Sequence, residues 1–107
     1  MATPKPGQQA RGSSSGRPVM VLLDALGRRW ALRILWELRG APLSFRALRS
    51  ACDDASPSVL NQRLTELRDL ALLTSTDEGY ALTPEGERLG VLLVDLDRFA
   101  QHWAKKL

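Results

Sequence analysis

The sequence has few of the residues on which disulfide frameworks, metal sites and aromatic cores depend. Among its 107 residues, Cys52 is the only cysteine and His102 the only histidine. A lone cysteine excludes an intramolecular disulfide, and its spacing predicts simple packing on the apolar face of a helix. The isolated histidine has no second metal-ligating neighbour, so we expect no metal site and no cofactor.

Long hydrophobic runs are also lacking. The longest, Val19–Leu23, is far too short for a bilayer, which needs about 20 apolar residues. Asp24 and then Arg28 and Arg29 follow it, and this is not the cleavage pattern of a secretory signal. We therefore expect no membrane contact, and a cytoplasmic location fits the sparse use of cysteine. The sequence shows no nucleophile–base pair and no phosphate loop, so an enzyme is not predicted.

The main part of the chain has no excess charge of either sign. The net charge of +3 comes entirely from Lys5, Arg11 and Arg17, and the remaining residues carry 12 bases and 12 acids. Net charge therefore gives little support for nucleic-acid binding. Residues 1–17, rich in Pro, Gly, Gln and Ser, predict a flexible basic tail ahead of a single domain at 18–107.

Hydrophobic spacing within that domain is mostly helical. Pro18, Ser44, Ser56 and Thr83 are expected to begin helices, as capping residues or as a first-turn proline. Glu78-Gly79 predicts a hairpin turn. The expected elements are helices at about 18–27, 28–39, 44–53, 56–70 and 84–105, and strands at about 72–77 and 80–83. This order predicts a mainly α fold, a winged helix-turn-helix with a short two- to three-stranded antiparallel β wing.

The strongest functional pattern is the pair of helices at 44–53 and 56–70. In a helix-turn-helix the second helix enters the major groove, which admits one α-helix. Its predicted outer face is polar and carries Ser58, Asn61, Gln62, Thr65 and Arg68. Amides such as Asn61 and Gln62 can pair with adenine, and Arg63 can pair with guanine. Ser56 and Ser58, near the helix start, are expected to contact phosphate.

Other charged and aromatic residues leave alternatives open. Arg28 and Arg29 either contact phosphate or form an ordinary solvated face, and Trp30 belongs either to the core or to an effector pocket. Asp77 and Glu78 at the expected hairpin tip would repel a phosphate backbone. That acidic tip favours the alternative of a winged-helix protein-interaction module without direct DNA binding.

Four segments in this order resemble the HxlR-type branch of winged-helix regulators, which is related to the MarR group. They are LDALGRRWALRIL at 23–35, FRAL at 45–48, SPSVLNQRLTEL at 56–67 and YALTPEG at 80–86. The resemblance implies that the helix at 56–70 is the recognition helix and that the strands form the wing. It also implies that the first and last helices make a dimer, and surplus apolar residues agree with this. The expected dimerisation residues are Val19, Leu22, Leu23, Leu92, Leu96, Phe99 and Trp103.

The sequence departs from the family pattern in two places. Many members have a Cys-Pro pair before the first helix, some of them for sensing, whereas this chain has Arg17-Pro18. Thiol sensing by that route is therefore not expected. The wing is short and acidic, and the basic tail is a hypothetical substitute for its phosphate contacts. The resulting prediction is a homodimeric repressor on double-stranded DNA with a pseudo-palindromic operator, responding to an unknown signal such as a small-molecule effector.

Overall fold

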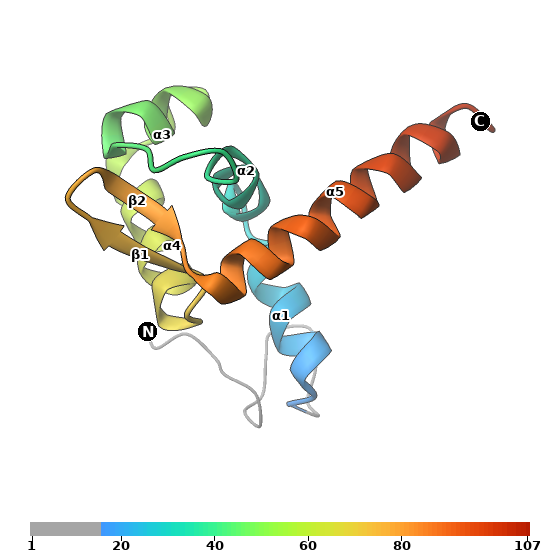
Figure 1. Cartoon of the computed structure of the whole chain (residues 1–107), viewed down its shortest axis with the longest axis horizontal. Helices are drawn as coiled ribbons and strands as arrows, with labels where there is room; N and C mark the ends of the chain where they lie inside the picture. Colours follow the sequence, from blue (N-terminus) through green and yellow to red (C-terminus); the bar gives the residue numbers. More distant parts are fainter. Residues whose placement is uncertain (1–15) are drawn as a thin grey trace.

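The computed structural model describes residues 16–107, which form a helical body with a small hairpin and one projecting helix (Figure 1). The helices are α1 (Pro18–Leu26), α2 (Ala31–Glu37), α3 (Phe45–Ala51), α4 (Pro57–Asp69) and α5 (Pro84–Ala104). The strands are β1 (Leu73–Thr76) and β2 (Gly79–Leu82). The order of elements confirms the predicted winged helix-turn-helix.

Side-chain caps begin three of these helices as the sequence predicts. Ser44 Oγ accepts from the Ala47 N–H at 3.0 Å, and Ser56 Oγ accepts from the Val59 N–H at 3.3 Å. Thr83 Oγ1 accepts from the Gly86 N–H at 3.1 Å. Each such cap contributes about 1 kcal/mol, because it satisfies a donor that the first helical turn leaves unpaired.

The start of α2 differs from the prediction. The helix was expected from Arg28, but it begins at Ala31 because Trp30 has a left-handed backbone with φ of 73°. A non-glycine residue in this region is unfavourable by itself, so surrounding contacts must hold the turn between α1 and α2. Apolar spacing continues through the turn and conceals the break.

The core is assembled from leucines of every helix together with Cys52. Ile34, Leu48, Leu60 and Cys52 are completely buried, which confirms the prediction that the cysteine packs in the core. Leu64 and Leu67 extend the predicted stripe of α4. Ala71 does not, because it follows the helix end with φ of 60° and is exposed.

The hairpin pairs Leu73 with Leu82 and Thr76 with Gly79 in antiparallel register. Its turn therefore falls on Asp77-Glu78, one residue earlier than the predicted Glu78-Gly79. Gly79 has φ of 124°, and a Cβ there would lie 2.5 Å from the Leu43 carbonyl oxygen. This close approach allows an isolated antiparallel β-bridge between Leu43 and Tyr80. The sheet itself has two strands, and the bridge lies where a short third strand was expected.

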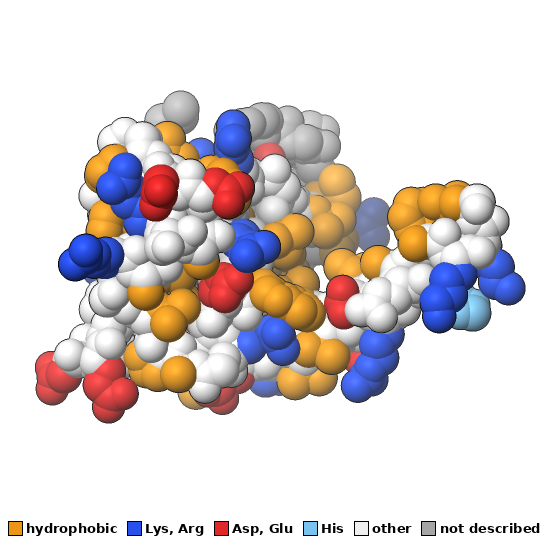
Figure 2. Space-filling view, turned by 90° about the horizontal axis from the view of Figure 1, so that it is seen from above, with side chains coloured by type: hydrophobic (Ala, Val, Ile, Leu, Met, Phe, Trp, Pro, Cys, Tyr) orange, Lys and Arg blue, Asp and Glu red, His pale blue; other side chains and the backbone are white. Residues whose placement is uncertain are grey.

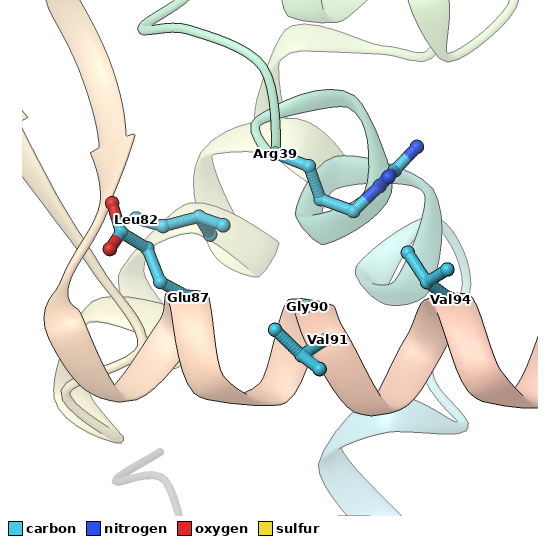
Figure 3. Close-up of a pocket in the computed structure, with 6 residues that line it drawn as sticks. All are labelled: Arg39, Leu82, Glu87, Gly90, Val91 and Val94. Atoms are coloured by element: carbon cyan, nitrogen blue, oxygen red, sulfur yellow. The ribbon is translucent and has the colours of Figure 1, made fainter.

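The first half of α5 packs against the rest of the protein, and its second half is mostly exposed. Gly86, Leu89, Gly90 and Leu93 are buried, whereas the later residues project beyond the body (Figure 1). A Cβ on Gly90 would lie 3.4 Å from Arg39 Cγ, so the Arg39 stem packs across this glycine. Beside it lies an open cavity of about 270 Å³, lined by Arg39, Leu82 and residues of α5. Figure 3 shows the side chains that line it.

Candidate functional site

Helix α4 presents an exposed polar face opposite its buried leucines. Ser58, Asn61, Gln62 and Thr65 are all exposed, as predicted from their spacing. The burial of Leu60, Leu64 and Leu67 on the other side fixes the rotation of the helix. These four side chains, called the α4 polar face below, are short or planar groups that can donate and accept hydrogen bonds.

The connection from α3 to α4 is held by backbone contacts of one arginine. Asp53 and Asp54 have φ of 52° and 56°, which turns the chain sharply between the two helices. Arg49 Nε donates to the Ala55 carbonyl at 2.9 Å, and the Asp54 N–H donates to the Arg49 carbonyl at 2.9 Å. The α4 polar face therefore belongs to a braced helix-turn-helix.

The start of α4 carries Ser56 and Ser58. The Ser56 hydroxyl caps the helix while the residue stays exposed, and Pro57 occupies the first turn. Ser58 is also exposed at the positive end of the helix dipole. Both hydroxyls lie where an anion would approach the helix N-terminus.

Arg63 lies differently from the α4 polar face. Its Nε donates to the Arg29 carbonyl at 3.0 Å, and its Nη1 donates to Glu66 Oε1. Only 15% of its side chain is exposed. The structure thus turns Arg63 toward the protein, and its expected contact with guanine remains a prediction that these contacts do not favour.

Glu66 was not predicted to be part of the site, because its burial and its ion pairs are not evident from the sequence. It is buried on α4 and also pairs with Arg28, whose Nη1 lies 2.8 Å from Glu66 Oε2. Arg28 Nη2 lies 3.2 Å from Asp24 Oδ2 of α1. The i, i+3 spacing of Arg63 and Glu66 is typical of an ion pair within a helix. The link to Arg28 is non-local and has no sequence signal.

Burial acts to lower the pKa of Arg28, but the hydrogen bonds and negative charges of Glu66 and Asp24 outweigh it, and the net pKa is raised. Its positive charge is therefore permanent and internally compensated. Of the two predicted phosphate-binding arginines, only Arg29 is exposed, with its guanidinium 5.2 Å from the Trp30 ring centre. Trp30 itself packs against the core, one of the two readings of its role.

The hairpin tip and the basic tail carry charges of opposite sign, and only the tip is unfavourable to an anionic partner. Asp77 and Glu78 are exposed at the hairpin tip. The tail bases Lys5 and Arg11 lie outside the described residues. Arg17 is described and exposed just before α1.

Apolar side chains are also exposed on α1 and α5. Leu92, Leu96, Phe99 and Trp103 of α5 are each more than half exposed, as are Val19 and Leu23 of α1. Leu22 is only partly exposed and packs against the core. Figure 2 shows hydrophobic side chains along one side of the projecting end of α5 and basic ones along the other. The α1–α5 apolar face below means Val19, Leu23, Leu92, Leu96, Phe99 and Trp103.

Within residues 16–107 no cluster of three or more His, Cys, Asp or Glu could hold a metal ion. No helix in the same range has the length and apolarity needed to cross a membrane. Burial raises the pKa of the Cys52 thiol, which therefore stays protonated near neutral pH.

Comparisons with known proteins agree with this geometry. A family model described as HxlR-like helix-turn-helix matches residues 25–107. The chain is 30% identical over 88 residues to YvaP, an HTH-type transcriptional regulator of Bacillus subtilis (strain 168), covering 76% of this chain and 82% of that protein. The crystal structure of quinone-bound YodB from B. subtilis superposes with a TM-score of 0.71 at 25% identity, covering 83% of this chain and 97% of YodB.

Proposed function

The chain belongs to the HxlR-like helix-turn-helix family of transcriptional regulators, and we propose that it binds a pseudo-palindromic operator as a homodimer and represses transcription. Repression would follow from occupancy of promoter DNA. We place this activity in the cytoplasm, where a DNA-binding regulator meets its target. The response to a small-molecule effector stays a prediction.

The observation that carries the proposal is the α4 polar face. Asn61 and Gln62 stand exposed on a helix whose rotation is fixed by three buried leucines. A braced helix of this kind can enter a major groove and present its amides to adenine edges. We propose Asn61, Gln62 and Thr65 as the base-contacting set, with Ser56 and Ser58 at the adjoining phosphates.

Arg63 and Arg28 have a different part in this proposal. Both are turned toward Glu66, so their charges are compensated within the protein. We propose that they support α4, whereas Arg29 supplies phosphate attraction. The tail bases Lys5, Arg11 and Arg17 would add to it. This distribution predicts a modest salt dependence, because each phosphate neutralised contributes about 0.9 to the logarithmic slope.

The homodimer is supported by the α1–α5 apolar face. A soluble monomer rarely leaves a row of Leu, Phe and Trp in water along a projecting helix. A second copy would cover this face by two-fold symmetry, with each α5 packing on the other chain. The two α4 helices would then be presented to the same side of a DNA duplex, about one turn apart.

In vitro selection from random duplex DNA by the purified full chain tests the proposal. We expect enrichment of a two-fold symmetric sequence that the protein binds at moderate salt. Enrichment of no sequence, with binding no tighter than to random DNA, would reject operator recognition. It would favour the protein-interaction module, which the acidic hairpin tip of Asp77 and Glu78 also supports. A reporter driven by a promoter carrying the selected site then tests repression.

A further inference from the structure

A chain of buried ionic contacts joins α1 to α4. Asp24 of α1 pairs with Arg28 in the following turn, Arg28 pairs with Glu66 of α4, and Glu66 pairs with Arg63. Arg63 then donates back to the carbonyl of Arg29. Between 9% and 16% of each of the four ionic side chains is exposed, so water screens these contacts only partly.

A gain in folding stability does not explain the arrangement of Arg28. Its Nε is buried and has no hydrogen-bond partner among residues 16–107, which carries a desolvation penalty. A buried ion-pair network is weak evidence for added stability, because an apolar replacement is often as stable. What the network does supply is a defined geometry, since the rigid, planar guanidinium of Arg28 contacts Glu66 through Nη1 and Asp24 through Nη2.

Apolar packing does not fill the space between α1 and the chain that follows α4. A cavity of about 120 Å³ remains there, lined by Pro18, Val21, Leu22, Leu70 and Leu72. The turn from α1 to α2 also includes the left-handed Trp30, which local propensity does not favour. The ionic contacts at the other end of α1 are therefore well placed to decide its angle to α4.

We propose that Arg28 is a positioning residue that fixes the angle between α1 and α4, and thereby the operator half-site spacing that the dimer accepts. This inference rests on the proposed function. Because α1 contributes Val19 and Leu23 to the α1–α5 apolar face, its angle sets where the partner copy lies. The separation of the two α4 polar faces follows from that position.

The experiment measures the affinity of Arg28→Met for the selected operator and for versions with the spacer changed by one or two base pairs. Methionine keeps the apolar stem and leaves Glu66 paired with Arg63. We expect wild type to lose about tenfold in affinity on each altered spacer, because one α4 is then misplaced on its half-site and loses base contacts. The variant should lose less than about threefold on the same series, with weaker binding to the original operator.

A control variant, two further variants and a stability measurement make the outcome decisive. Arg33→Met removes an exposed arginine that pairs with Glu37 inside α2, and it should keep the wild-type spacing profile. Glu66→Gln should flatten the profile like Arg28→Met, and the double variant should add little because both break the same link. Denaturant unfolding, compared with wild type, establishes that each variant is folded.

DNA with one half-site scrambled separates positioning from damage to α4. Arg28→Met should bind this DNA within about twofold of wild type, because the base-contacting side chains are unchanged. An unchanged spacing profile, or equal losses on the single half-site and the full operator, would overturn the inference. Failure of wild type to bind any selected DNA would instead reject the proposed function.

Discussion

Arg63 on α4 donates a 3.0 Å hydrogen bond to the backbone carbonyl of Arg29, 34 positions earlier in the chain. This contact joins the predicted recognition helix to the turn that precedes α2. It also occupies the guanidinium of a residue whose chemistry alone suggests contact with guanine. The position of a side chain within the fold therefore changes the role proposed for it.

Arg63→Ala should destabilise the fold as well as weaken DNA binding. The change leaves the Arg29 carbonyl without its donor and Glu66 with Arg28 alone. We expect the free energy of unfolding to fall by about 1–3 kcal/mol, measured by urea denaturation. Arg68→Ala, on an exposed position of the same helix, is the matched control and should cost less than about 0.5 kcal/mol. Equal stability of the two variants would contradict the bracing role.

The helices could be predicted well from the sequence because their signals are local. Ser44, Ser56 and Thr83 are caps that act within one turn, and the leucine spacing of α4 identifies its buried side. The late start of α2 was missed, since nothing in the apolar spacing indicates that Trp30 has a left-handed backbone.

The candidate site was only partly predictable, because some of its contacts join residues that are far apart in the sequence. Exposure of Asn61 and Gln62 follows from helical periodicity, whereas the engagement of Arg63 and Arg28 depends on a partner far away in the sequence. Glu66 looks like an ordinary surface acid in the sequence. Only the packing of α1 and its turn against α4 makes it a buried link.

Gly86→Ala should strongly destabilise the protein. A Cβ at this position would lie 1.9 Å from the Leu72 carbonyl oxygen, and backbone cannot move aside easily. We expect a loss of roughly 3 kcal/mol in unfolding free energy, seen as a lower thermal midpoint. Gly40→Ala is the matched control, because no atom of the described part of the chain lies within 4 Å of its added Cβ, and it should stay within about 0.5 kcal/mol of wild type. Similar midpoints for both would refute the close contact of α5 with Leu72.

Cys52 should be unreactive in the folded protein. It is completely buried, and the same burial raises its pKa, so little thiolate is present near pH 7. Labelling by a soluble thiol reagent should be roughly a hundredfold slower than in denaturant, because it requires opening of the core. Labelling at the unfolded rate would show that the thiol is accessible and reopen a sensing role.

Phe99→Glu should prevent formation of the proposed dimer without unfolding the single chain. Phe99 is 62% exposed on α5, so a charge is tolerated in the single chain but not within an apolar interface. Sedimentation velocity should give about twice the chain mass of 11.8 kDa for wild type and the chain mass itself for the variant. Gln101→Glu, on the exposed polar side of α5, should stay dimeric. A monomeric wild type would remove the basis of the two-fold operator.

Base contact by the α4 amides is tested most directly by the affinity of the Asn61→Ala/Gln62→Ala double variant for the selected operator. Fluorescence anisotropy at fixed salt should show a loss of about tenfold to a hundredfold on that operator and almost none on random DNA. Gln101→Ala loses an exposed amide on α5 and should bind like wild type. Undiminished operator affinity of the double variant, or an equal loss on random DNA, would contradict recognition through this face of α4.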